Sequence, residues 1–231
     1  MKTVVITGSA RGLGFNMARF FREYNYNVVI SDLKEENLIE AKSELEKFNS
    51  NAGVNQPQKA VWELSEQEIN TLIDVDLKGT IYGSKVAMEE MIKHKHGAIY
   101  NVEGYGSNNA HMLGLNMYGT SKRAVTHFTE SLALECEEKK TGIIVGKLSP
   151  GIMITKFTTH SLVDNKIELS EKTKKVYNIL GDTPETVGKF LVDRMVNNTK
   201  NNVKINWLTN RKAFLRFLTA GFNKRDFFKE D

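Results

Sequence analysis

The chain has 231 residues, of which 40% are hydrophobic and 26% charged, and its formal net charge is +4. These values are typical of one globular domain with a buried core and exclude a disordered chain. Residues 200–231 hold eight Lys or Arg and three Asp or Glu, so the first 199 residues are nearly neutral and no nucleic-acid groove is expected there.

Short apolar runs alternate with amphipathic helical patterns along the chain. The predicted strands are residues 4–7, 27–31, 98–102, 143–148 and 203–208. Predicted helices follow the first strand and cover residues 34–48, 65–94, 116–139, a segment opened by Thr183-Pro184-Glu185, and 210–220. This alternation predicts right-handed βαβ crossovers in a single α/β domain, 1–231, with a doubly wound and mainly parallel sheet.

A glycine-rich turn links the first strand to the first helix. Glycines permit a tight turn and close backbone approach, so the helix N-terminus can face a pyrophosphate. Turn chemistry alone is the alternative explanation. The candidate cofactor residues here are Gly8, Ser9, Arg11, Gly12, Leu13 and Gly14. Their spacing, T-G-x-x-x-G-x-G, resembles the short-chain dehydrogenase/reductase family, which implies a Rossmann-like fold that binds NAD or NADP.

Asp32 ends the second predicted strand, where a carboxylate can accept hydrogen bonds from an adenosine ribose. A 2′-phosphate would meet like charge there, so Asp32 favours NAD. Arg11 favours NADP, because a basic residue at this place often accompanies NADP in the family that the chain resembles. We expect NAD, with NADP as the alternative cofactor. A helix N-cap is the structural alternative for Asp32.

Tyr118 and Lys122 match the Tyr-x-x-x-Lys signature of the same family. Four-residue spacing puts both side chains on one helix face, where the lysine charge can lower the phenol pKa for proton exchange with a substrate oxygen. A solvated helix face is the alternative. The resemblance implies that Lys122 also binds the nicotinamide ribose. It further implies that Pro150, Gly151 and Thr155, which match P-G-x-x-x-T, bind the cofactor, with the Thr155 hydroxyl on the nicotinamide amide.

Two positions depart from the family pattern. The serine that orients a substrate carbonyl is expected at Gly104, and Ser107, three residues later, replaces it only if the loop bends inward. The helix asparagine of the family is Asp76 here, within Val75-Asp76-Leu77. We keep Ser107 and Asp76 as candidate catalytic residues, and we expect slowed or altered carbonyl chemistry rather than none.

The Asn-Val-Glu-Gly-x-Gly-Ser form at residues 101–107 resembles the chlorophyll b reductase branch of the family. Two later stretches, PETVGKFLVDRM at residues 184–195 and FLTAGFNKRDFF at residues 217–228, resemble the same branch. The family resemblance covers about residues 1–157, and the branch resemblance covers roughly 98–228. It does not name the substrate.

The triplet Asn51-Ala52-Gly53 resembles the family loop that follows the fourth strand, yet it arrives too early. The helix at 34–48 leaves no room for a further βαβ crossover, which takes about 30 residues or more. We infer a deletion of one helix and two strands, the third and fourth. We expect a thinned sheet of order 2-1-5-6-7, in which the first strand pairs directly with the fifth.

The remaining segments support weaker predictions. Residues 156–182 occupy the place of the family's substrate lid, and 203–231 form a last strand and a basic C-terminal helix and tail. The apolar face within 210–228 predicts packing, including a subunit interface of a homo-oligomer, or weak contact with an anionic membrane surface.

A single cysteine, Cys136, and a start without a signal-peptide pattern favour a cytoplasmic protein. No metal site is predicted.

Together these features predict an NAD(P)-dependent oxidoreductase that moves a hydride between nicotinamide and a small carbonyl or alcohol substrate. Tyr118 is its expected acid and base, supported by Lys122. The alternatives are a dinucleotide-binding protein without turnover and a peripheral membrane or scaffold protein.

Overall fold

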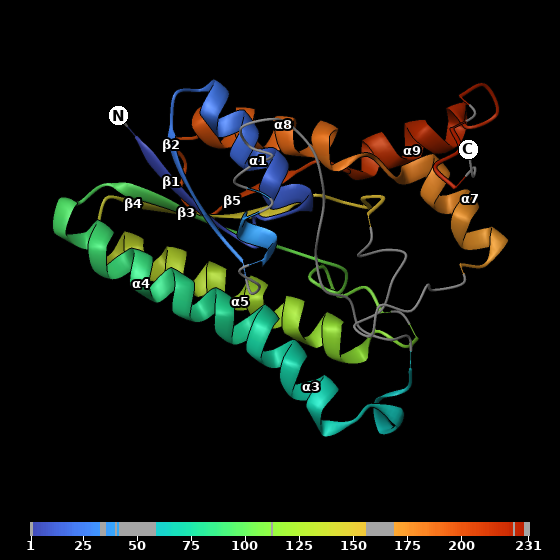
Figure 1. Cartoon of the computed structure of the whole chain (residues 1–231), viewed down its shortest axis with the longest axis horizontal. Coiled ribbons are helices and arrows are strands. Elements are labelled where there is room, and N and C mark those ends of the chain that lie inside the picture. The colour runs from blue at the N-terminus through green and yellow to red at the C-terminus, as the bar shows by residue number, and fades with distance from the viewer. Residues whose placement is uncertain are drawn as a thin grey trace. The chain divides into compact units, whose positions relative to one another are not determined.

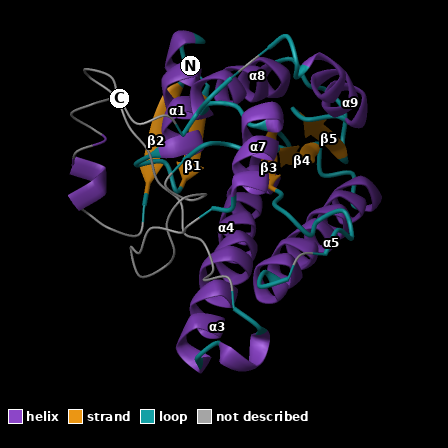
Figure 2. Ribbon diagram, turned by 90° about the vertical axis from the view of Figure 1, so that its right-hand side faces the viewer, coloured by secondary structure: helices purple, strands orange, loops and turns teal. Residues whose placement is uncertain are grey.

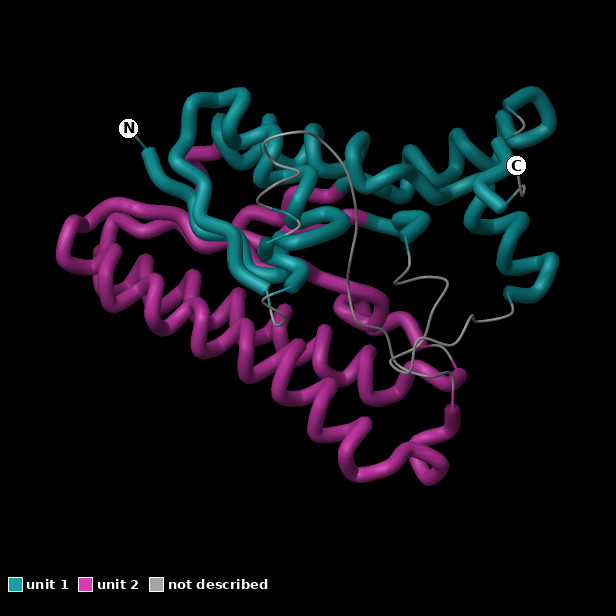
Figure 3. Tube along the Cα trace, viewed as in Figure 1, with its two compact units in different colours: residues 1–55, 151–197, 207–231 teal, residues 56–150, 198–206 magenta. Residues whose placement is uncertain are grey.

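The computed structural model describes residues 2–32, 36–39, 41, 59–111, 113–155, 169–223 and 225–228. The chain divides into two compact units, which are described separately (Figure 3). Unit 1 comprises residues 1–55, 151–197 and 207–231, and unit 2 comprises residues 56–150 and 198–206. The single domain inferred from the sequence stays a prediction. No helix among the described residues is long and apolar enough to cross a membrane.

Unit 1 opens with a βαβ crossover. Strand β1 (Thr3–Thr7) pairs in parallel with β2 (Asn27–Ser31), and α1 (Gly12–Glu23) connects them. The apolar side of α1 is buried, and α8 (Pro184–Val196) packs along it (Figure 1). Gly188 permits the close approach, since a Cβ there would lie 3.1 Å from the Asn16 Cβ. Residues 36–39 and 41 are helical, as predicted within 34–48.

The other described elements of unit 1 are helices α7 (Glu171–Leu180) and α9 (Asn210–Thr219) and a parallel bridge between Met153 and Asp182. Helix α7 contacts α9. Helix α7 was absent from the sequence prediction, although Ser170 caps it by accepting a hydrogen bond from the Thr173 amide. An N-cap serine followed by an acid is a readable start signal. The charged composition of 171–175 conceals it.

Unit 2 contains a sheet of order β3-β4-β5 with all strands parallel: β3 (Gly97–Val102), β4 (Ile143–Ser149) and β5 (Val203–Asn206). Helices α4 (Gly79–His94) and α5 (Asn116–Glu138) run side by side and pack on β3 and β4 (Figures 1 and 2). A short 3₁₀ turn, η1 (Val61–Glu63), opens the described part of the unit.

The long helix predicted for 65–94 is present and begins with the predicted capping box. Ser65 Oγ accepts the Glu68 amide at 3.2 Å, and the Glu68 carboxylate accepts the Ser65 amide at 2.8 Å. The helix is not uniform, however. A π-helical segment, η2 (Ile73–Lys78), lies between α3 (Glu66–Leu72) and α4. Such segments often occur at functional sites, and this one carries Asp76.

The predicted parallel α/β arrangement is confirmed within each unit. The described strands form one parallel sheet in each unit, β1-β2 in unit 1 and β3-β4-β5 in unit 2. The single thinned sheet of order 2-1-5-6-7 stays a prediction.

Candidate active site

The glycine-rich turn of unit 1 has the geometry expected of a phosphate cradle. Gly8 and Gly12 adopt φ values of +61° and +60°, which glycine tolerates best. A Cβ on Gly14 would lie 2.5 Å from the Gly8 carbonyl oxygen, so this position also requires glycine. Ser9 ties the turn to β2, because its Oγ accepts the Ser31 amide at 2.9 Å. The predicted turn residues therefore share one rigid turn.

The first turn of α1 has the features of an anion site. No side chain caps its N-terminus, and it contains no acidic residue. Its amide groups and the positive end of the helix dipole thus favour a negatively charged ligand. Leu13, half-buried, lies in this first turn. The residues present fit the pyrophosphate of a dinucleotide.

Asp32 lies beside the turn at the end of β2. One carboxylate oxygen accepts the Ala10 amide at 3.4 Å, and the other accepts the Asn37 side-chain amide at 3.2 Å. The Arg11 guanidinium donates to the Asn37 side-chain carbonyl. The two residues that favour different cofactors in the sequence are therefore linked through Asn37, which sequence reasoning missed. Asn37 is buried. Nothing in the charged stretch predicted as a helix marked it as a site residue.

The stretch 150–155 follows β4. Gly151 adopts φ +73°, and a Cβ there would lie 2.7 Å from the Leu208 Cβ, so the predicted Pro150-Gly151 turn needs its glycine. Thr155 is buried. The triplet Asn51, Ala52 and Gly53 lies outside the described residues, as do residues 156–168 of the predicted lid.

Unit 2 places Tyr118, Lys122 and Asp76 together. The Lys122 ammonium lies 5.6 Å from the centre of the Tyr118 ring and forms an ion pair with Asp76 Oδ1 at 3.2 Å. Both side chains of the pair are 15% exposed, and Tyr118 is buried. Burial raises the pKa of the Tyr118 phenol above its ordinary value, and the Asp76 carboxylate raises it further. The helix spacing thus brings the two signature residues to one face of α5, as predicted, but the pKa of Tyr118 is raised and not lowered as predicted.

Gly104 explains how the buried phenol is accommodated. A Cβ on Gly104 would lie 2.4 Å from the Tyr118 hydroxyl oxygen and 2.9 Å from Lys122 Cγ. A Cβ on Gly106 (φ +94°) would lie 2.5 Å from the Gly119 Cα. The loop after β3 therefore packs on α5 through glycines. The phenol occupies the space that a side chain at position 104 would fill.

Ser107 is buried in the same loop. Its hydroxyl donates to the Lys122 carbonyl and accepts the Gly104 amide, both at 3.2 Å. Its carbonyl accepts from Arg123 at 2.9 Å. These contacts fasten the loop to α5 beside Lys122. Donation from Ser107 to a substrate carbonyl stays a prediction, because it requires the hydroxyl to leave the Lys122 carbonyl.

Glu103 is a buried acid next to Gly104 that sequence reasoning did not single out. One oxygen accepts from the Thr126 hydroxyl at 3.2 Å, and the other lies 2.6 Å from the Lys204 ammonium. Lys204 belongs to β5, so the pair joins the end of β3 to β5 within unit 2. An acid immediately after an apolar strand was the available signal. Its partner is 101 positions away in the chain and unreadable from the sequence.

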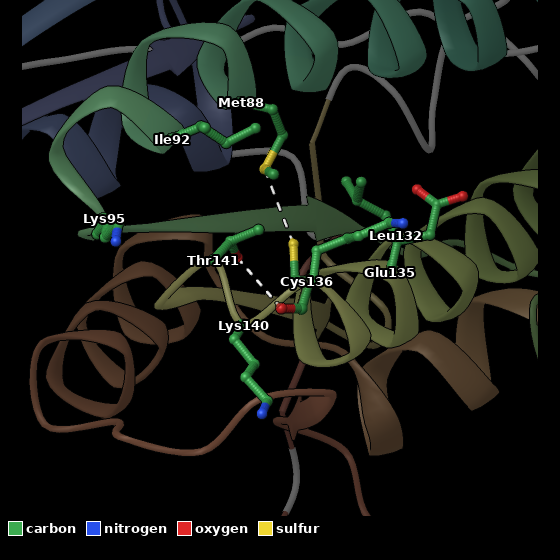
Figure 4. Close-up of a pocket in the computed structure, with 9 residues that line it drawn as sticks. Met88, Ile92, Lys95, Leu132, Glu135, Cys136, Lys140 and Thr141 are labelled. Atoms are coloured by element: carbon green, nitrogen blue, oxygen red, sulfur yellow. Dashed lines mark hydrogen bonds between the residues drawn. The ribbon is translucent and has the colours of Figure 1, made fainter.

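A cavity of about 500 Å³ in unit 2 lies away from this centre (Figure 4). Cys136 lines it near the last turn of α5, whereas Tyr118 lies in the first turn. The Cys136 thiol is buried and donates to the Met88 sulfur at 3.9 Å. Ala133, Ile143 and Val145 pack around it. Cys136 is therefore a packing residue of the core of unit 2.

The basic C-terminal segment is anchored by Asp182 within unit 1. Arg216 and Arg225 form ion pairs with its two oxygens at 2.7 and 3.2 Å, and the Trp207 indole donates to it at 2.6 Å. Several apolar side chains remain exposed on or after α9: Phe214, Leu215, Phe217, Leu218 and Phe222. Arg216 and Arg225 are thus engaged by Asp182, whereas the apolar side chains on and after α9 are exposed. Membrane contact and a homo-oligomer interface both stay predictions.

Comparison with known proteins agrees with this geometry. A family model described as short chain dehydrogenase matches residues 2–50 and 47–166. The chain belongs to the short-chain dehydrogenase family. The match falls into two segments that meet at residues 47–50, as a deletion just before Asn51 predicts.

Individual relatives support the predicted branch. The chain is 25% identical to the probable chloroplastic chlorophyll(ide) b reductase NYC1 of Oryza sativa subsp. japonica, with 100% of the chain and 54% of the relative covered. It is 26% identical to chlorophyll(ide) b reductase NOL of Arabidopsis thaliana, with coverages of 94% and 72%. The chain spans about half the length of the NYC1 relative.

Solved structures support the fold. The closed form of serine dehydrogenase complexed with NADP+ matches with a TM-score of 0.69 and 21% identity over 88% of this chain and 94% of the other. At this identity the likeness shows the fold alone. The predicted Rossmann-like fold with fewer strands is confirmed.

Proposed function

We propose that the chain is an NAD(P)-dependent oxidoreductase that transfers a hydride between nicotinamide and the carbon of a small carbonyl or alcohol substrate. The observation that carries this proposal is the buried Tyr118 phenol one helical turn from Lys122, which is itself paired with Asp76. A phenol with a lysine beside it is a general acid and base for a substrate oxygen. A solvated helix face would leave both side chains exposed.

The glycine turn of unit 1 is the proposed pyrophosphate site. Its supports are the positive φ values of Gly8 and Gly12 and the uncapped N-terminus of α1. Asp32 supports NAD, because its carboxylate would repel a 2′-phosphate. Arg11 is held by Asn37 beside it and supports NADP as the alternative. Thr155 is the proposed contact of the nicotinamide amide, and Pro150, Gly151, Asn51, Ala52 and Gly53 are further proposed cofactor-binding residues.

When bound, the nicotinamide supplies the hydride in reduction or accepts it in oxidation. Tyr118 donates its hydroxyl proton to the carbonyl oxygen as the alcohol forms, and accepts that proton in the reverse direction. Lys122 orients the phenol and, as the family resemblance implies, holds the nicotinamide ribose. Asp76 balances the lysine charge. Gly104 leaves room for the phenol where a serine would otherwise stand. The proposed substrate is a small ketone, aldehyde or alcohol.

The test is hydride transfer on a panel of aldehydes, ketones and alcohols with NAD and NADP in both redox states, with Tyr118→Phe as the control. We expect turnover in the wild type and its loss in the variant. A thermal-shift titration with each cofactor accompanies it, since a ligand that binds only the folded state raises its stability. Stabilisation without turnover on any substrate would favour a dinucleotide-binding protein. Stabilisation by neither cofactor would reject the proposal.

A further inference from the structure

The position of Asp76 gives the group formed by Tyr118, Lys122 and Asp76 a charge balance that differs from the family pattern. Its Oδ1 pairs with the Lys122 ammonium at 3.2 Å, and both side chains are largely buried. Its Oδ2 is buried and has no hydrogen-bond partner among the described residues. A full carboxylate charge is thus held inside the site, at the place where the family pattern has a neutral asparagine.

This carboxylate opposes the effect of the lysine on the phenol. An unpaired ammonium near a phenol stabilises the phenolate, whereas an ion pair presents almost no net charge. The hydroxyl oxygen of Tyr118 also lies against the backbone of Gly104, which gives a phenolate little access to water. Both effects raise the pKa of Tyr118, burial being the larger.

The other charged groups on the elements around Tyr118 are themselves engaged. Glu103 at the end of β3 pairs with Lys204 at 2.6 Å, and Asp74 pairs with Lys78 at 2.7 Å on η2. Arg123 on α5 donates to the Ser107 carbonyl. Among the described residues, Asp76 is therefore the group whose charge most directly offsets Lys122.

We propose that Asp76 holds Tyr118 in its protonated form and thereby sets this site for carbonyl reduction rather than alcohol oxidation. This inference rests on the proposed function. In the reduction, the Tyr118 O–H bond breaks and its proton forms the hydroxyl of the product alcohol. The hydride that forms the new C–H bond comes from the reduced nicotinamide, which is oxidised. Tyr118 then regains its proton from solvent.

The first test needs no turnover. Protein labelled with ¹³Cζ-tyrosine is titrated by NMR, and the Tyr118 signal is assigned by its loss in Tyr118→Phe. In the wild type we expect no ionisation of Tyr118 up to the pH at which the protein unfolds. In Asp76→Asn we expect the pKa of Tyr118 to fall by about 1–3 units, into the observable range. Asp74→Asn, two residues away and exposed, is the matched control and leaves the Tyr118 signal unchanged.

Lys122→Met is a second variant. It keeps most of the side-chain stem but removes the charge that compensates Asp76, so we expect Tyr118 to stay protonated throughout the titration. Circular dichroism checks that each variant is folded. An unchanged Tyr118 titration in folded Asp76→Asn, or its ionisation at lower pH in Lys122→Met, would overturn the inference.

The second test is the pH dependence of kcat/KM for carbonyl reduction. Reduction requires the protonated phenol, so its rate falls as the pH rises through the pKa of Tyr118. We expect this fall in Asp76→Asn at the pH where its phenol ionises, and we expect none in the wild type or in Asp74→Asn up to the pH at which the protein unfolds. If no variant turns over but the NMR titration shifts, the proposed function fails and the role of Asp76 stands. If the proteins turn over but the titration of Tyr118 does not shift, the proposed function stands and the role of Asp76 fails.

Discussion

The glycine turn of unit 1 and the surroundings of Tyr118 in unit 2 depart from the family pattern to different degrees. The glycine turn of unit 1 matches the expected spacing, and its geometry requires glycine at positions 8, 12 and 14. The Tyr118 centre of unit 2 keeps the tyrosine and lysine but has Gly104 and Asp76 at the two supporting positions. The glycine turn therefore fits the family pattern without change, whereas the surroundings of Tyr118 differ from it at two positions.

The difference shows where the chemistry tolerates change. A pyrophosphate is bound by backbone amides, so a turn that holds them must keep its backbone conformation. Proton transfer depends on charge and burial around one hydroxyl, and different side chains can set these. The substitutions at 104 and 76 alter the surroundings of Tyr118 and leave its placement on α5 intact.

The largest expected effect is the loss of the proton donor. Tyr118→Phe removes the hydroxyl without creating a cavity, and general acid catalysis contributes roughly 10²–10⁴-fold. We expect kcat to fall by that factor while the affinity for NAD(H), measured by calorimetry, is unchanged. Equal losses of affinity and rate would show that the residue supports the fold rather than the proton transfer.

Gly14→Ala tests the other region of the comparison, the glycine turn of unit 1. The new Cβ would lie 2.5 Å from the Gly8 carbonyl oxygen, so the turn must shift. We expect loss of the stabilisation that NAD provides, which is about 2.7 kcal/mol at 100 times its Kd. The matched control is Gly83→Ala in α4, where a Cβ meets nothing within 4 Å. A cofactor-induced shift that survives in Gly14→Ala argues against the pyrophosphate site.

Gly104→Ser tests whether the serine of the family pattern can stand beside Tyr118 in this chain. The family pattern alone predicts that a serine here restores activity. The structure predicts the reverse, because the Cβ would lie 2.4 Å from the Tyr118 hydroxyl and displace it. We expect kcat/KM for reduction to fall about 100-fold, the scale of a 1 Å misplacement. A faster Gly104→Ser enzyme would contradict the description of the centre.

Asp32→Ser has the smallest expected effect. It removes the charge that opposes a 2′-phosphate and keeps a small hydrogen-bonding side chain. We expect the ratio of the Kd values for NADP and NAD to change in favour of NADP on the order of tenfold, or about 1.4 kcal/mol. Calorimetric titrations of both cofactors measure this ratio. An unchanged preference would assign Asp32 to holding Ala10 and Asn37 alone.

The sequence predicted those parts of the fold that depend on local patterns. The alternation of strands and helices, the capping box at Ser65 and the pairing of Tyr118 with Lys122 all follow from spacing along one element. The π-helical segment that carries Asp76 was not predictable, because no local sequence rule marks a change from α to π hydrogen bonding.

The parts that failed depend on distant contacts. Glu103 finds Lys204, and Asp182 finds Arg216 and Arg225, through the packing of segments far apart in the chain. Periodicity identifies strands, but which edges pair depends on the helices that cover each sheet.

Transfer of deuterium tests the central claim most directly. Wild-type protein and Tyr118→Phe are each mixed with a carbonyl substrate found in the panel and with reduced nicotinamide deuterated at the transferred position, and the product is analysed by mass spectrometry. Our account predicts an alcohol with one deuterium on the carbinol carbon from the wild type and almost none from the variant. Equal labelling by both proteins, or no labelled alcohol from wild-type protein that binds the cofactor, would contradict it.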